Sequence, residues 1–111
     1  MTISWEDFSK IDLRAGTIVD AKIFEQALRP AYLLWVDFGD ELGIKKSSAQ
    51  ITVHYDLNEL IGKQVLAVVN FPPKQIGPIR SECLVTGFYD QNGDVVLAVP
   101  ERALNNGAKL G

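Results

Sequence analysis

Residues 31–51 have the sequence AYLLWVDFGDELGIKKSSAQI, two strand-like runs on either side of a short turn with glycine at each end. The first run places Leu34, Val36 and Phe38 on one face of an extended chain and Trp35 on the opposite face. The turn at residues 39–43 joins this run to the second one. The pattern therefore predicts that residues 31–51 form a β-hairpin.

Period-two alternation continues on both sides of this hairpin. Before it, a strand is predicted over residues 11–23, with Gly16 marking a bend or bulge. After it, the clearest buried strand covers residues 64–70 and ends at two prolines, which cannot continue a ladder. The remaining predicted strands are residues 81–89 and 95–99.

Helix and turn signals divide these strands. Ser4 and Asp7 have the spacing of a capping box and predict a short helix at residues 5–9. A second cap-like start at Asp56, with a stop at Gly62, predicts another short helix. Residues 71–80 are expected to be a loop, and the Asn-Gly pair at residues 92–93 indicates a type I′ hairpin turn.

Up to residue 89 the predicted order is strand, strand, strand, short helix, strand, strand, and residues 95–99 return beside the last of these. This is the order of the OB-fold, a five-stranded barrel that presents strands 2 and 3 and two loops to its ligands. We therefore expect a mostly β protein with one short helix between strands 3 and 4 and an extension at each terminus.

Length and charge are consistent with one modest domain. The chain has 111 residues and a formal net charge of −3. Residues 1–111 fit one domain. The net negative charge argues against a protein whose whole surface binds phosphate groups. The charge is uneven, because residues 42–81 carry five Lys or Arg and two Asp or Glu. That basic stretch is either a binding surface for anions or an accident of a short chain.

Cysteine usage and the apolar runs bear on the compartment. The single cysteine, Cys83, allows no internal disulfide, which suits a reducing compartment. The first residues are acidic and lack the apolar segment of a signal peptide. No apolar run approaches the roughly 20 residues of a membrane helix. We expect a cytoplasmic protein without membrane insertion.

Groups for catalysis are scarce. His54 is the single histidine, and with one cysteine it cannot complete a structural zinc site. Cys83 alternates into a predicted strand and is expected to be a buried, unreactive thiol. No glycine run has the spacing of a phosphate-binding loop. We therefore expect a binding protein that is not an enzyme and uses no metal or cofactor.

Two polar stretches are candidates for the binding surface. Residues 45–50 are polar and lie on a predicted strand, so one face of that strand is expected to be exposed to solvent. Residues 70–80 interleave basic and apolar side chains, which can contact phosphates and bases or hold an unfolded peptide. Each stretch also has an ordinary interpretation, a solvated strand in the first case and a loop packed on the barrel in the second.

Three segments carry a family resemblance: SSAQIT at 47–52, VVNFPPKQIG at 68–77 and SECLV at 81–85. They resemble the CsaA proteins, a branch of the tRNA-binding OB-fold group, and the similarity runs from residues 12–18 to residues 106–107. The resemblance implies a homodimeric, secretion-related chaperone for unfolded, exported preproteins, with the protein export machinery as a further candidate partner. Together with the polar stretches it points to these residues for binding of peptide or tRNA: Lys45, Lys46, Ser47, Ser48, Gln50, Asn70, Phe71, Lys74, Ile76, Ile79, Arg80, Ser81 and Glu82.

The last of these segments separates two functions. The tRNA-binding members of the group usually carry glycine and methionine where this chain has Glu82 and Leu84. A carboxylate beside the groove repels phosphate, so the resemblance favours the chaperone branch, with weak tRNA binding. A structure-specific tRNA-binding protein is the alternative, favoured by the basic stretch and by the group as a whole.

Both termini carry apolar side chains that a minimal barrel does not need. Trp5 and Phe8 lie before the first strand, and Ala103 and Leu110 lie after the last one. Such groups need burial, and a twin subunit related by two-fold symmetry supplies it. These four residues are the predicted dimer interface.

Overall fold

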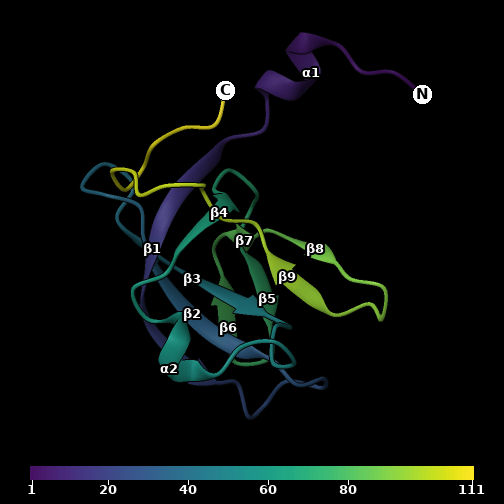
Figure 1. Ribbon diagram of the computed structural model, residues 1–111, viewed down its shortest axis with the longest axis vertical. Helices are drawn as coiled ribbons and strands as arrows, with labels where there is room; N and C mark the ends of the chain where they lie inside the picture. The colour runs from purple at the N-terminus through teal and green to yellow at the C-terminus, as the bar shows by residue number, and fades with distance from the viewer.

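The computed structural model describes residues 1–111 and shows a barrel built on one strongly curved sheet (Figure 1). The sheet has five strands in the order β3-β2-β1-β4-β7, and every neighbouring pair is antiparallel. Its strands are β1 (Leu13–Ile23), β2 (Tyr32–Asp37), β3 (Ile44–Ala49), β4 (Gln64–Val68) and β7 (Leu84–Val85). The short helix α2 (Leu57–Leu60) connects β3 to β4. This confirms the predicted mostly β, five-stranded barrel with one helix between strands 3 and 4.

Two small ribbons and one more helix complete the elements. The ribbons pair β5 (Lys74–Ile76) with β6 (Ile79–Ser81), and β8 (Gly87–Tyr89) with β9 (Val95–Leu97). Helix α1 (Trp5–Ser9) begins at the predicted capping box, in which Ser4 Oγ accepts the Asp7 N–H at 3.0 Å and Asp7 Oδ2 accepts the Ser4 N–H at 3.2 Å. Neither helix has the length or the hydropathy needed to cross a membrane.

The predicted hairpin at residues 31–51 is confirmed as β2 and β3, with Trp35 opposite Lys46. Leu34, Val36 and Phe38 point into the barrel and are almost fully buried. They pack with Ile18 of β1 and other apolar side chains into one core. Because strand side chains alternate, Trp35 and Lys46 lie on the outer face of the same two strands.

Gly16 does not form the bend that its position in β1 suggests. The pairing of β1 with β4 runs regularly through Gly16, and the register with β2 shifts between Ile18 and Asp20 instead. A Cβ atom on Gly16 would lie 2.7 Å from side-chain atoms of Phe38 and Val36. Glycine is therefore required at this position by close packing of the barrel wall and not by a bulge.

Residues 71–80, predicted as a loop, contain the β5–β6 hairpin. Ile76 faces Ile79, so that Gly77 and Pro78 alone form the turn, and Gly77 has a φ of +57°. Glycine with positive φ at the first central position is the requirement of a tight hairpin turn. The strands are only three residues long and follow two prolines, and such short runs give too little periodicity to be recognised.

The last predicted strand is also interrupted. Residues 81–89 divide into the end of β6, then β7, then β8. Between β7 and β8, the Thr86 N–H donates to the Leu66 carbonyl at 2.9 Å and the Thr86 carbonyl accepts the Ala98 N–H at 3.1 Å, so the chain changes partner here from β4 to the segment after β9. The turn at Asn92-Gly93 is not type I′, because only Gly93 has positive φ. The connection spans residues 90–94, where Asp90 Oδ1 accepts the N–H groups of Asn92 and Asp94 at 2.8 and 3.0 Å. A local side-chain acceptor thus organises a longer loop.

The two terminal segments are held against the barrel in different ways, the first by the side chain of Asn70 after β4 and the second by backbone bonds to β1. Asn70 Oδ1 accepts the Asp12 N–H at 2.9 Å and Asn70 Nδ2 donates to the Lys10 carbonyl at 2.7 Å. The residues that precede this attachment form an exposed arm that contains α1 and projects from the barrel (Figure 1). The C-terminal tail is bound to β1 through backbone bonds from Ala15 to Ala108 and from Leu110 to Leu13.

Candidate functional site

A cavity of about 610 Å³ lies between β3 and the β5–β6 hairpin. Its wall is mostly apolar, with Phe71, Pro72 and Pro73 leading into β5. Polar groups from β3 and β6 interrupt this wall. The full lining is Ser48, Phe71, Pro72, Pro73, Lys74, Ile76, Ser81, Glu82, Cys83 and Leu84. The combination of an apolar wall with few convergent polar groups is typical of a ligand site.

Side chains fasten the hairpin to the free edge of β3. Glu82 Oε1 accepts the Lys46 N–H at 3.0 Å, and the Lys46 carbonyl accepts the Glu82 N–H at 2.7 Å. Ser81 Oγ accepts the Ser48 N–H at 3.2 Å. These bonds replace the ladder of a further strand and close the barrel. They also occupy edge groups of β3, which are then not free to pair with a peptide backbone, so a ligand must be held mainly through side chains here.

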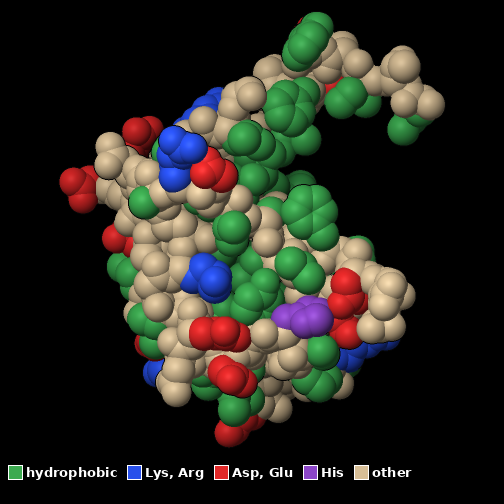
Figure 2. Space-filling model, in the orientation of Figure 1, with side chains coloured by type: hydrophobic (Ala, Val, Ile, Leu, Met, Phe, Trp, Pro, Cys, Tyr) green, Lys and Arg blue, Asp and Glu red, His purple; other side chains and the backbone are tan.

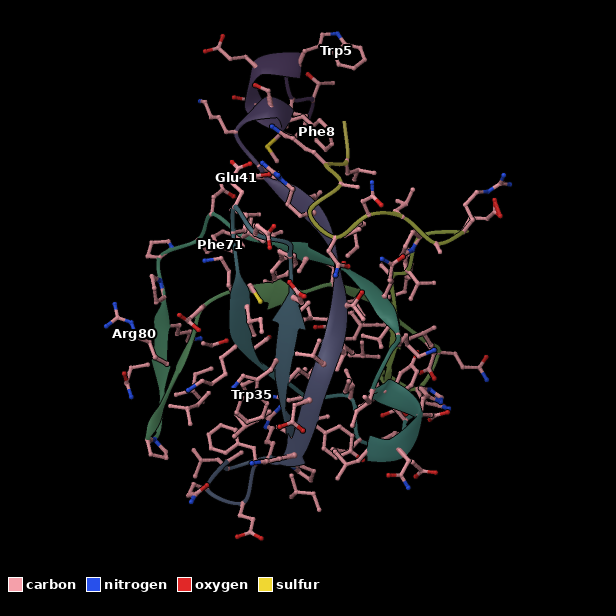
Figure 3. All side chains as sticks on the ribbon, turned by 90° about the vertical axis from the view of Figure 1, so that its left-hand side faces the viewer. Trp5, Phe8, Trp35, Glu41, Phe71 and Arg80 are labelled. Carbon is pink, nitrogen blue, oxygen red and sulfur yellow. The ribbon has the colours of Figure 1, made fainter.

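Six of the predicted binding residues line the cavity together: Ser48, Phe71, Lys74, Ile76, Ser81 and Glu82. Ile76 and Ile79 are half-buried, so each retains some apolar surface on the hairpin for a ligand. Arg80 points away from the barrel on the outer side of the hairpin (Figure 3). Lys45 and Lys46 precede Ser48 on β3, and Gln50 follows that strand as an exposed residue.

Two predicted binding residues serve the fold instead. Ser47 is 1% exposed and faces the interior of the barrel opposite Leu34, because it alternates with Lys46 and Ser48. Both polar ends of the Asn70 side chain are engaged by the segment that follows α1, as described above. Ser47 and Asn70 are therefore structural residues beside the cavity.

Burial determines the chemistry of Cys83. Desolvation raises the pKa of this thiol to about 12, and the positive charge of Lys45 opposes the rise. The thiol is therefore neutral at physiological pH and a poor nucleophile. This agrees with the prediction of a buried, unreactive cysteine.

The outer face of β2 carries an aromatic group absent from the predicted site. The Nζ atoms of Lys22 and Lys46 lie 5.5 and 6.0 Å from the ring centroid of Trp35, within the range of cation–π contacts. Trp35 is half-buried on the same face as Ser48 of the cavity. The alternation of residues 31–38 already placed Trp35 outward, but Lys22 is remote in sequence and only the sheet brings it there.

His54 forms a contact far from the cavity. Its Nε2 lies 2.7 Å from Asp90 Oδ2, and this bond, together with the backbone bonds to Asp90, lowers the pKa of that carboxyl. Asp94 lies near the same pair. The histidine is exposed, as expected, and it links the loop before α2 to the β8–β9 hairpin.

The sequence and the fold have known relatives. Residues 13–109 match the family described as putative tRNA binding domain. This chain belongs to the tRNA-binding domain family. The family is a non-catalytic binding module, and its members include parts of much larger enzymes. The chain is 32% identical over 108 residues to methionine–tRNA ligase of Porphyromonas gingivalis, and it spans 15% of the length of that relative.

Within the tRNA-binding domain family, the solved CsaA structures resemble the whole chain. Chaperone CsaA from Bacillus anthracis strain Ames has a TM-score of 0.94 and 50% identity, covering 100% of both chains. The CsaA chaperone protein from Picrophilus torridus has a TM-score of 0.93 and 48% identity, over 99% of this chain and 100% of that one. These similarities confirm the resemblance to the CsaA proteins inferred from the three sequence segments.

Proposed function

We propose that this protein is a homodimeric chaperone that binds unfolded, exported preproteins in the cavity beside the β5–β6 hairpin. The observation that carries the proposal is the apolar wall of this cavity. It is formed by the solvent-exposed side chains of Phe71, Pro72, Pro73 and Leu84. Support also comes from the similarity to the two CsaA chaperones, each of which matches this chain over its full length.

The size and chemistry of the cavity suit a client that is bound and released. About 610 Å³ accommodates a few side chains but no folded domain. Burial of one apolar side chain contributes about 1.5–3 kcal/mol, and ordering of the client opposes it. Binding is therefore expected to be in the micromolar range and tolerant of sequence.

The dimer is supported by the exposure of apolar side chains at both termini. Trp5 is 91% exposed in the single chain, and Phe8, Ala103 and Leu110 are exposed as well. Ile3, Ser4, Trp5 and Phe8 line a separate open hollow of about 390 Å³ on the arm itself. Figure 2 shows hydrophobic side chains gathered on the face below the arm, where the molecule is hollowed. A second copy that covers this face would bury them.

The second candidate function is tRNA binding, favoured by the family match and by the names of the aminoacyl-tRNA ligases that the chain resembles. Trp35 with Lys22 and Lys46 offers a ring and two cations for a base and its phosphates. The partly exposed carboxylate of Glu82 opposes phosphate at the cavity. We therefore rank tRNA as the weaker ligand. The proposed compartment for either function is the reducing cytoplasm.

The deciding experiment is a parallel titration of the protein with an unfolded preprotein and with tRNA, each at two salt concentrations. Preprotein binding should be micromolar and change little with salt, because apolar contacts dominate it. tRNA binding should be weaker and should fall with a log–log salt slope no steeper than about −4 per subunit, because the two polar stretches carry only four basic groups, Lys45, Lys46, Lys74 and Arg80. Absence of preprotein binding, with tight and steeply salt-dependent tRNA binding, would reverse the ranking. Light scattering at micromolar concentration tests the dimer, and a 12.3 kDa species alone would refute it.

A further inference from the structure

The strand β5 has a neighbouring strand on one side only. It forms a two-stranded ribbon with β6, and β6 lies on the side of β3, to which Ser81 and Glu82 fasten the hairpin. The opposite edge of β5 has no strand beside it, and Lys74 and Gln75 are exposed there. An unpaired edge of this kind is a template on which another extended chain can form a further strand.

The register of the hairpin directs the backbone groups of Gln75 toward this free edge. Ile76 and Ile79 flank the two-residue turn and pair with each other, so they exchange the hydrogen bonds that close it. Because bonded and non-bonded pairs alternate along an antiparallel ladder, Gln75 faces Arg80 without a bond to it. The N–H and C=O groups of Gln75 therefore point outward, and no loop hydrogen bond uses them. The Gln75 side chain is engaged separately, since its Nε2 donates to the Gly77 carbonyl at 2.9 Å.

The two faces of β5 differ in what they offer a client. Lys74 and Ile76 face the cavity and belong to its lining. Gln75 alternates to the other face together with Arg80, which points away from the barrel (Figure 3). Side chains that lie opposite each other on neighbouring strands share a face. A client residue opposite Gln75 would therefore direct its side chain away from the cavity, and the residues on either side of it would lie beside Lys74 and Ile76 at the cavity mouth.

Prolines limit how far this edge can pair. Pro73 precedes β5 and Pro78 follows it in the turn, and neither has an N–H to donate. Proline beside an edge strand is a common protection against extended pairing between copies of one chain. The edge therefore offers only a short pairing centred on Gln75, which can hold a client only together with apolar contacts in the adjacent cavity.

We infer that an unfolded client adds as a short strand to the outer edge of β5 and pairs its backbone with Gln75. The client residue opposite Gln75 carries any side chain except proline, and at least one residue next to it is apolar and enters the cavity beside Ile76. A folded protein already uses its backbone groups in its own structure, so this edge selects unfolded chains. The inference rests on the proposed peptide-binding function and specifies which segment of a client that site accepts.

The test is a scan of backbone methylation in the client. A labelled peptide of about nine residues carries one triplet of leucine, serine and leucine among polar residues, so that its register on β5 is fixed. An N-methyl group is placed on each of the five central residues in turn, and binding is measured by fluorescence anisotropy. Methylation of the residue opposite Gln75 should weaken binding by about three- to tenfold, because it removes one backbone hydrogen bond. Methylation of either adjacent residue should change affinity by less than about twofold, because those N–H groups point to solvent.

Two substitutions at one position separate the backbone from the side chain. Gln75→Pro removes the outward N–H and should weaken binding of the unmethylated peptide by about three- to tenfold. Gln75→Ala is the matched control, since it keeps that N–H and should bind within about twofold of the parent. Circular dichroism verifies the fold of each variant. The methylation scan uses the unaltered protein, so it decides the question even where Gln75→Pro does not fold.

The possible failures are distinguishable. Equal affinity of all the methylated peptides, or normal binding by a folded Gln75→Pro variant, would overturn this inference while the chaperone proposal stands. Absence of binding by the unmethylated peptide, in a protein that also fails to bind unfolded preprotein, would overturn both. Loss of the dimer in Gln75→Pro, with peptide binding retained, would assign the edge of β5 to a second copy of the chain instead.

Discussion

Glu82 and Lys46 form a reciprocal pair that closes the barrel, with the Lys46 N–H donating to the Glu82 carboxylate at 3.0 Å and the Glu82 N–H donating to the Lys46 carbonyl at 2.7 Å. The side chain of one residue thus completes the backbone ladder of another, 36 positions away. The same carboxylate lines the candidate cavity. Stability and ligand choice therefore depend on one group.

Replacement of Glu82 separates these two roles. Glu82→Ala leaves the Lys46 N–H without its acceptor and should lower the free energy of unfolding by about 1–2 kcal/mol. Glu82→Gln keeps an acceptor and should lower it less, while removal of the negative charge should raise tRNA affinity several-fold. Urea unfolding and tRNA titration measure the two effects. Equal stability of Glu82→Ala and the parent would show that the pair is not required.

The apolar side chains of the hairpin should be needed for peptide binding. Ile76→Ser with Ile79→Ser should weaken binding of an unfolded preprotein by about tenfold or more, because each loss removes on the order of 1 kcal/mol of apolar contact. Ile61→Ser, at an exposed site just after α2, is the matched control and should bind normally. If the double variant keeps its circular dichroism spectrum and its affinity, the peptide site lies elsewhere.

Asn70 should control the position of the N-terminal arm. Asn70→Ala removes the bonds to the Lys10 carbonyl and the Asp12 N–H, so the arm loses its orientation while the core is untouched. The expected result is a dimer dissociation constant raised by about tenfold, measured by sedimentation, with peptide binding to the barrel retained. Unchanged dimerisation would mean that the arm contributes little to the interface. Asn58→Ala, at an exposed position on α2, serves as the control.

Gly16→Ala should destabilise the barrel. The added Cβ would lie 2.7 Å from side chains of Phe38 and Val36, which are themselves almost fully buried and have no room to move. Overpacking of this kind costs about 1–3 kcal/mol, visible as a lower urea midpoint. Gly111→Ala, where a Cβ would meet nothing within 4 Å, is the control and should unfold like the parent.

Cys83 should be protected from alkylation and should make stability depend on alkaline pH. Because its folded-state pKa is raised to about 12, the native thiol should react with iodoacetamide far more slowly at pH 8 than the unfolded chain does. The unfolded thiol, with a pKa of about 8.5, ionises first as the pH rises. The contribution of Cys83 to stability is therefore complete below that value and is lost between it and pH 12. A Cys83→Ala variant with the same alkaline unfolding profile would contradict this.

Local sequence determined much of the fold. The hairpin at residues 31–51 was predictable because alternation over six or more residues on each strand places whole faces in the core or in solvent. The capping residues Ser4 and Asp56 marked both helices, since the capping bonds, from the Asp7 N–H to Ser4 Oγ and from the Asp56 N–H to Glu59 Oε1, span only three residues along the chain. The three family segments indicated a candidate binding region near β3 and residues 70–82, because a family motif made of contiguous residues can be recognised without knowledge of the fold.

Tertiary structure decided which of those residues can meet a ligand. Ser47 and Ser48 are identical in type and adjacent in sequence, yet the pleat of β3 buries one and directs the other to the cavity. Lys22 reaches Trp35 only through the pairing of β1 with β2, and Asn70 reaches Lys10 only across 60 positions. The β5–β6 hairpin and its fastening to β3 depend on contacts between short segments that carry no periodic signal of their own. Such long-range contacts form once the barrel closes, and no local pattern encodes them.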